Sequence, residues 1–260
     1  MCIDVIEFID FIEDDRGSVG RVVELYKKKR SVDAKDVKEK HGRTWIWTAL
    51  EVKSRLLVCY FIGDRILKDA RSFLLALKSR CKEKPLFVSD ELPHYEDGLK
   101  ELYHKKIKPE LTGRRGRPRK TLKMVDEELD YATVHKTREN GRVVKVEQKI
   151  VFGVPQRIEK RLAESPSNTI NTAYVERSNL SLRLWDAHLT RKALTFAKSI
   201  RWLKSKFVLV VGFYNFVRPH SSLKEKINGV LHLRTPAMAA GITDHPWSIS
   251  ELLKFNLLCQ

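Results

Sequence analysis

The sequence has no apolar run long enough to cross a bilayer. Its longest, Phe207 to Val217 (FVLVVGFYNFV), has 11 residues, whereas a membrane-spanning helix needs about 20. This run is therefore expected to form a buried helix. No signal peptide is expected at the start of the sequence either, because no charged segment followed by an apolar one opens it.

Cysteine is scarce and scattered. The four cysteines, Cys2, Cys59, Cys81 and Cys259, show neither a CxxC pattern nor a Cys/His spacing. This pattern argues against a disulfide framework and a zinc site, and predicts free thiols in a reducing cytoplasm. A bound metal would then need oxygen ligands.

Acidic residues are in the minority. Aspartate and glutamate number 33 against 50 lysines and arginines, which gives a net charge of +17 and a pI near 9.7. Such a balance favours a polyanionic partner, with nucleic acid ahead of an anionic membrane surface. The 260 residues, 42% of them hydrophobic, suffice for one large domain or two small ones and exclude a wholly disordered chain.

Apolar periodicity predicts an α/β sheet layered with helices. An Asn140-Gly141 pair between alternating segments predicts a hairpin over 130–153. The segments 13–42 and 105–130 are too charged to predict regular structure. The expected strands are 1–12, 43–52, 55–64 and 86–89, and the expected helices are 66–82, 92–104, 155–164, 168–183, one or two within 191–216, and 248–258.

The segment 168–183, NTINTAYVERSNLSLR, organises the rest of the chain. Asn168, Thr169 and Asn171 are each good N-caps, so Glu176 is expected inside an ordered helix. Positions 176, 179, 180 and 183 then share one helix face. A carboxylate, an amide and an arginine together suit a site that binds metal and phosphate.

Asp90 is the second candidate acid, because it follows the short apolar strand of the string FVSDELPHY. Carboxylates that meet in a basic protein repel unless a divalent ion neutralises them, and oxygen ligands select Mg²⁺ or Mn²⁺. Two such ions could support phosphoryl transfer. A structural interpretation stays open: Asp90 as a turn or N-cap residue, and Glu176 as a solvated helix charge.

Several strings in order resemble the catalytic domain of DDE transposases, most closely those of IS1-like insertion sequences. They are TWIWTALEVKSRLLVCYFIGDR, PLFVSDELPHYEDGL, NTAYVERSNLSLR, LTRKALTFAKS, FYNFVRPHSSL and RTPAMAAGITD, and they cover roughly residues 43–250. The resemblance implies a ribonuclease H-like mixed sheet flanked by helices. It also implies that Asp90 and Glu176 are the second and third metal-binding acids, while Asn179 and Arg183 contact DNA or support the acid.

The first acid departs from the family's pattern. The family has an aspartate in its first strand, in a string like DEIWSF, and this sequence has no such string. Asp10 in VIEFIDFIE is favoured, with Asp4 and Glu24 as alternatives. The family's amino-terminal DNA-binding region is also not expected here, so a truncated chain that binds DNA without cutting it stays an alternative.

A basic string, GRRGRPRK at 113–120, contains the RGRP core of an AT-hook. Such a segment can enter the minor groove of A·T-rich DNA, where the negative potential is greatest. The alternative is a basic loop that contacts phosphates without sequence preference. Both interpretations assign DNA binding to Arg114, Arg115, Arg117, Arg119 and Lys120.

The resulting hypothesis has a catalytic domain at 1–190, which includes the basic loop 105–130, and a helical extension at 191–260. The expected activity is metal-dependent cleavage of element ends and transfer of the 3′-hydroxyl into target DNA. Its expected partners are double-stranded DNA and a second copy of the chain on paired ends, in a prokaryotic cytoplasm at the nucleoid. A nuclease of the same fold that only hydrolyses is a further alternative.

Overall fold

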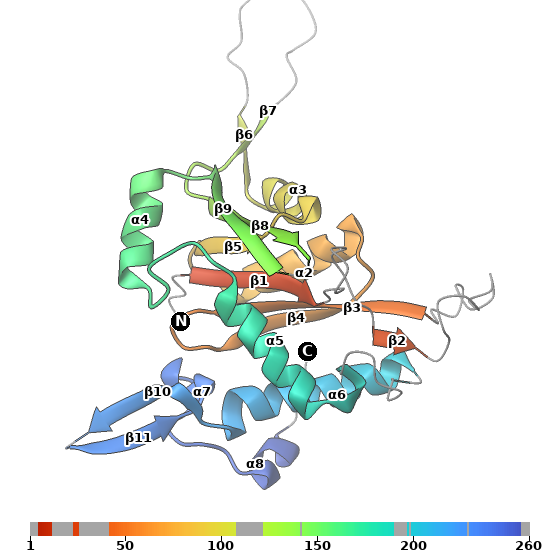
Figure 1. Ribbon diagram of the computed structural model, residues 1–260, viewed down its shortest axis with the longest axis vertical. Coiled ribbons are helices and arrows are strands. Elements are labelled where there is room, and N and C mark those ends of the chain that lie inside the picture. Colours follow the sequence, from red (N-terminus) through yellow and green to blue (C-terminus); the bar gives the residue numbers. More distant parts are fainter. Residues whose placement is uncertain are drawn as a thin grey trace, which may run out of the picture.

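The computed structural model describes residues 5–11, 23–25, 42–107, 122–140, 142–189, 197, 199–227 and 229–255. These residues form a mixed α/β fold, in which helices flank one mixed sheet (Figure 1). The strands of this sheet are β1 (Val5–Phe11), β2 (Val23–Leu25), β3 (Gly42–Glu51), β4 (Leu57–Gly63), β5 (Leu86–Asp90), β8 (Asp130–Glu139) and β9 (Arg142–Phe152).

Strand β1 lies in the middle of the sheet, whose order is β2-β3-β1-β5-β8-β9. It runs antiparallel to β3 and parallel to β5, and β5 runs parallel to β8. Strands β2 and β4 both pair with β3, β2 with its first residues and β4 with the rest. Strand β9 returns antiparallel to β8 and ends the described sheet.

Helices cover both faces of the sheet. On one face, α2 (Leu67–Arg80) and α3 (Pro93–Leu102) bury Phe73 and Tyr95 against Trp47 of β3. On the other face, α4 (Pro155–Glu164) packs Ile158 and Leu162 against β1, β5 and β8. The same face receives α5 (Ala173–Trp185) and α6 (Ile200–Gly212), which pack against β3 and β4. The pattern predicted for 66–82 is confirmed, since α2 turns its predicted apolar stripe inward.

The chain after α6 is less helical than predicted. Helix α6 continues into one π-helical turn, Phe213–Val217, and the chain then forms the hairpin of β10 (His220–Ile227) and β11 (Val230–Arg234). Short helices α7 (Pro236–Ala239) and α8 (Ile249–Lys254) follow. The hairpin was not predicted, because the lysines of β10 hide the alternation of its few apolar residues.

Asn215 joins this carboxy-terminal part to the sheet. Its side chain accepts the backbone N–H of Leu57 at 3.0 Å and donates to the carbonyl of the same residue at 3.1 Å. The amide thus bonds to β4 as a neighbouring strand would. Asn215 is 6% exposed, so both bonds are shielded from water.

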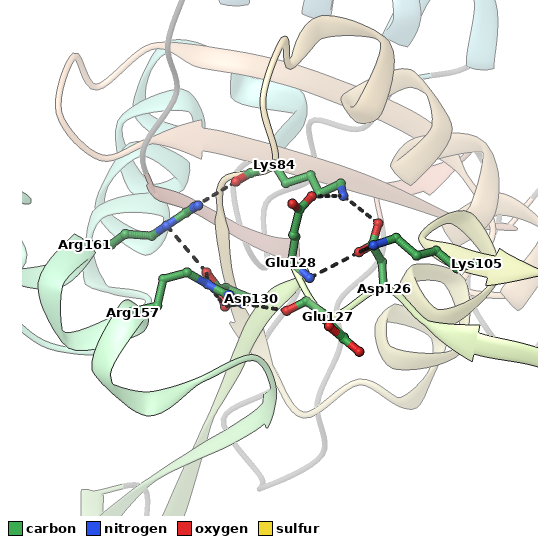
Figure 2. A network of polar contacts seen from close by, with 8 residues as sticks. All are labelled: Lys84, Lys105, Asp126, Glu127, Glu128, Asp130, Arg157 and Arg161. Carbon is green, nitrogen blue, oxygen red and sulfur yellow. Dashed lines mark hydrogen bonds and ion pairs between the residues drawn. The ribbon is translucent and has the colours of Figure 1, made fainter. Parts of the chain in front are cut away.

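The segment 105–130 also holds more regular structure than predicted. Strand β6 (His104–Ile107) pairs with β7 (Leu122–Val125) on either side of the basic loop. A polar network secures the base of this ribbon, where Asp126 accepts bonds from Lys84 and Lys105 (Figure 2). Its bonds to Lys84 hold the pKa of the Asp126 carboxyl well below its usual range.

The same network holds α4 against the start of β8. Asp130 is fully buried. Its carboxylate accepts hydrogen bonds from Arg157 at 2.6 to 3.0 Å and forms an ion pair with Arg161 at 3.5 Å (Figure 2). Arg161 also donates to the carbonyl oxygen of Lys84 at 2.7 Å. A buried charge requires such partners, so Asp130 fixes where α4 lies.

Candidate functional site

Helix α5 carries Glu176 and runs across the sheet beside β1 and β3 (Figure 1). It begins at Ala173 rather than at the predicted N-caps, and its N-cap residue, Thr172, makes no side-chain capping bond. Asn171 is the one predicted cap that acts as such, because its Oδ1 accepts the N–H of Ala173 at 2.9 Å. The next two N–H groups have to be satisfied from elsewhere.

Glu7 of β1 satisfies them. Its Oε2 accepts the backbone N–H groups of Tyr174 and Val175, each at 3.0 Å. A carboxylate at this position also interacts favourably with the positive end of the helix dipole. The first turn of α5, immediately before Glu176, is therefore fastened to the central strand of the sheet.

The Glu7 carboxylate is buried and only partly satisfied. The residue is 1% exposed, and Oε1 has no hydrogen-bond partner within the described part of the chain. Burial raises the pKa of Glu7 to about 8, against the lowering effects of its two backbone bonds and of Arg55, while Glu176 adds to the rise. Glu7 and Glu176 are thus close enough to repel.

Glu7 was not among the residues predicted as the first acid, which were Asp10, Asp4 and Glu24. The available signal was a glutamate flanked by Ile6 and Phe8 in the middle of a strand that is apolar at almost every position. A strand in the centre of a sheet has no solvated face, so a carboxylate there must have a dedicated partner.

Glu176 lies at the start of α5 and is held by two polar groups. Its Oε1 forms an ion pair with Nζ of Lys136, from β8, and accepts the Thr172 hydroxyl at 2.7 Å. Lys136 also donates to the Thr172 hydroxyl at 3.2 Å. The Glu176 side chain is 37% exposed, so it stays accessible from solvent.

Asp90 is the last residue of β5, as the sequence predicted. It is in register with Val134 of β8, two residues before Lys136, and Glu7 is in register with Val88, two residues before Asp90. Since positions two apart along a strand share a face, Glu7, Asp90 and Lys136 belong to one face of the sheet. This is the face that α5 covers, so Asp90 and Glu176 lie on the same side of the sheet.

The helix face predicted to carry Glu176, Asn179, Leu180 and Arg183 is divided in the structure. Asn179 is 3% exposed, and its Oδ1 accepts the hydroxyl of Thr48 in β3 at 3.1 Å. Leu180 is 56% exposed, and Arg183 is half-buried. Asn179 is therefore buried against β3, and its predicted role in DNA contact or in support of the acid stays a prediction, as does contact of Arg183 with DNA.

The structure does not identify the first of the three metal-binding acids that the resemblance implies. The position of Asp10 in β1 is in register with Trp47, which packs against α2 and α3, so it belongs to the face of the sheet opposite to that of Asp90 and Glu176. The side chains of Asp10 and Glu24, and all of Asp4, lie outside the described residues. In the part of the chain that the structure describes, no three Asp, Glu, His or Cys side chains form a group that could hold a metal ion. A metal site therefore needs a donor beyond Asp90 and Glu176.

The predicted DNA contacts Arg114, Arg115, Arg117, Arg119 and Lys120 also lie outside the described residues. Strands β6 and β7 show where their loop leaves and rejoins the fold, on the far side of α3 from α5 (Figure 1). DNA binding by this basic loop therefore stays a prediction.

Positively charged side chains lie around the start of α5. The Arg55 guanidinium stacks 3.6 Å from the ring centre of Tyr174, and its charge acts on Glu7. Burial, followed by Arg55 and Arg177, holds the pKa of His220 below its usual range. This positive environment offsets part of the repulsion between Glu7 and Glu176.

No protein-family model, curated protein or solved structure matches the chain. Within the described helices, none has the length and apolar character needed to cross a membrane.

Proposed function

We propose that the chain is a DDE-type DNA transposase with a ribonuclease H-like catalytic domain. It would cleave DNA at the ends of its element and join the freed 3′-hydroxyl to target DNA. The single observation that carries this proposal is the position of Asp90 and Glu176 on one side of the sheet, Asp90 at the end of β5 and Glu176 on the helix that covers that face.

The order of the elements supports the ribonuclease H-like assignment. A central β1 runs antiparallel to β3 and parallel to β5, and the next strand, β8, again runs parallel. In sheets with parallel strands, the carboxyl ends of those strands are a common place for ligand-binding side chains. Asp90 is at such an end.

Asp90 and Glu176 are the residues proposed to hold Mg²⁺ or Mn²⁺, and both fit as oxygen donors, since Asp90 ends a strand and Glu176 is partly exposed. Asp10, the predicted first acid, does not fit beside them, because its position in β1 belongs to the opposite face of the sheet. The ions would activate the attacking oxygen and stabilise the leaving oxygen. Lys136 would neutralise Glu176 until a cation replaces its ammonium group, and Glu7 would hold the first turn of α5 in place.

The net charge of +17 supports DNA as the substrate. A strongly basic protein gains affinity for DNA from counterion release, and this affinity falls as salt rises. The loop that carries Arg114 to Lys120, and Arg183 on α5, would supply phosphate contacts.

A second candidate is a DNA-binding chain that no longer cuts. The ion pair between Lys136 and Glu176 favours it, because a lysine already neutralises the third acid. Such a chain would bind element ends in competition with an active enzyme. It would keep its salt-sensitive DNA affinity without needing Asp90 or Glu176.

The test measures Mg²⁺- or Mn²⁺-dependent cleavage and joining on DNA that carries the element's own ends. Asp90→Asn and Glu176→Gln should each abolish both reactions while DNA binding persists. Glu159→Gln, on the exposed face of α4, is the matched control and should keep full activity. Cleavage that survives in either site variant would refute the proposal, and binding without any cleavage by the parent chain would favour the second candidate.

A further inference from the structure

Among the residues that the structure describes, β9 is an edge strand of the sheet and pairs on one side only. Every residue from Arg142 to Ile150 is exposed, although the segment pairs with β8 along its length. At the other edge of the sheet, β4 packs against α2. Exposed apolar side chains follow β9, with Val143 48%, Val144 58%, Val146 51% and Ile150 37% exposed.

Few proteins leave such an edge strand open. A long edge strand offers its free N–H and C=O groups to any other strand, and most proteins shorten, cover or charge such edges. Two irregularities do interrupt the pairing of β8 with β9, one near Ala132 and one near Arg138. Between them, Lys145–Ile150 of β9 pairs without a break, so this stretch alone is regular enough to take a further strand.

We propose that Val146–Ile150, within this regular stretch, pairs antiparallel with the same residues of a second copy of the chain, about a two-fold axis at Gln148. In this register Val146 lies opposite the second copy's Ile150, and Glu147 lies opposite its Lys149. Apolar side chains then meet apolar ones and acids meet bases, each pair occurring twice by symmetry. The interaction joins the two sheets into one.

The charges of β9 select this register. A shift of the axis to Glu147 places Lys145 opposite Lys149, which is repulsive. A shift to Val146 places Lys149 and Gln148 opposite valines in the irregular part of the strand. An axis between Glu147 and Gln148 pairs Val146 with Lys149 and Ile150 with Lys145, so both apolar residues face a charge.

The Glu147 carboxylate, which would contact Lys149 of the second copy, already pairs with a lysine of its own strand. Its carboxylate bonds to Lys145 of the same strand at 2.6 Å, and this bond lowers its pKa. Both side chains are more than half exposed and lie along the strand edge. Lys149 of a second copy would approach the same carboxylate from the opposite side.

The first experiment measures the mass of the full chain in solution by light scattering over a range of concentrations, without DNA. It is independent of the proposed DNA chemistry, so its failure would leave that proposal unaffected. A concentration-dependent dimer is expected, and Val146→Lys should weaken it about tenfold or more by placing a charge against Ile150. Val230→Lys, at an exposed valine of the separate hairpin strand β11, is the matched control and should leave the dimer unchanged.

The second experiment tests the register by disulfide formation in a chain whose Cys2 and Cys259 are replaced by serine. Gln148→Cys should cross-link two copies, because residues on the axis face themselves within disulfide range. Val146→Cys alone should not, whereas Val146→Cys mixed with Ile150→Cys should give the mixed dimer. A monomer at every concentration, a dimer that Val146→Lys does not weaken, or cross-linking at 146 alone would each overturn the proposed pairing.

Discussion

The carboxylate of Glu7 accepts the backbone N–H of Val175, 168 residues further along the chain, at 3.0 Å. This bond ties the central strand β1 to the helix that carries Glu176. It acts as a helix cap supplied by a distant strand, in place of the side-chain cap that Thr172 does not provide. The position of Glu176 over the sheet therefore depends on an acid far away in sequence.

Glu7 should make the chain less stable as pH rises. Its pKa is about 8 in the folded chain, against an ordinary value of 4.5, so between these values the folded state holds a proton that the unfolded state has lost. The stability contribution is complete below about pH 4.5 and is lost through pH 8, by up to about 1.4 kcal/mol per pH unit. Denaturant unfolding from pH 5 to 9 should show this slope in the parent and a reduced slope in Glu7→Gln.

The Glu7→Gln substitution keeps an oxygen that can accept the Tyr174 and Val175 N–H groups, so the variant is expected to fold. Glu159→Gln removes a carboxylate from an exposed position of α4 and should retain the parent's slope. Equal slopes in the parent and Glu7→Gln would mean that Glu7 does not titrate in this range.

Gly153 should be hard to replace because of its contact with Asp130. Its φ is +104°, and a Cβ there would come 2.2 Å from Asp130 Oδ1 and 3.1 Å from Asp130 Cα. Gly153→Ala is expected to lower the free energy of unfolding by about 3 kcal/mol, through backbone strain together with displacement of a buried carboxylate. Thermal or denaturant unfolding measures this.

Gly229→Ala is the matched control for that substitution. Gly229 also has a positive φ, +83°, but a Cβ there would meet nothing within 4 Å. Its substitution should cost about 1 kcal/mol, from backbone strain alone. If Gly153→Ala and Gly229→Ala lowered the free energy of unfolding equally, the contact with Asp130 would contribute nothing to the cost at Gly153.

Asn215 should be required for the carboxy-terminal part to stay on the sheet. Asn215→Ala leaves the N–H and C=O of Leu57 without their side-chain partner in a buried place, which should cost about 2 to 4 kcal/mol. Asn215→Asp keeps the acceptor for the N–H but loses the donor, and it buries a charge. It should therefore rescue little of the loss, as measured by denaturant unfolding at pH 7.

Two alanine variants would check that reasoning. Gln156→Ala changes an exposed side chain on α4 and should be close to neutral. An Asn215→Ala chain as stable as the parent would show that the two bonds to Leu57 contribute nothing net.

Lys136 should compete with divalent cations for Glu176. Replacing it by glutamine removes the ammonium group that binds Glu176 Oε1, so Mn²⁺ affinity should rise about fivefold, the equivalent of ~1 kcal/mol for a partly exposed ion pair. Titration calorimetry of the folded chain with Mn²⁺ measures this without any activity assay. Lys160→Gln, at an exposed position of α4, should have no such effect.

Glu176→Gln serves as the second control, since it should remove the effect of Lys136→Gln. Mn²⁺ binding that is unaltered by Lys136→Gln would separate this lysine from the candidate site. Mn²⁺ binding that is unaltered by Glu176→Gln would count against a metal role for Glu176 itself.

Local sequence patterns predicted most of the elements because these patterns depend on neighbours. The apolar stripe of α2 and the Asn140-Gly141 pair that predicts the hairpin of β8 and β9 are both patterns within a few residues of sequence. The hairpin of β10 and β11 was missed because its lysines and its few apolar residues do not alternate clearly. The start of α5 was placed too early, at residue 168, because Asn168 and Thr169 resemble N-caps as much as Asn171, the predicted cap that bonds to the first turn.

The sequence by itself therefore determined the α/β class, the strong positive charge, and the positions of Asp90 and Glu176 on a strand end and a helix. Only the tertiary structure decided that these two acids lie on the same side of one sheet, that Lys136 neutralises Glu176, and that Glu7 caps α5. The physical reason is that periodicity and capping preferences act over a few residues. Satisfaction of a buried carboxylate depends instead on which distant strand or helix the fold brings beside it.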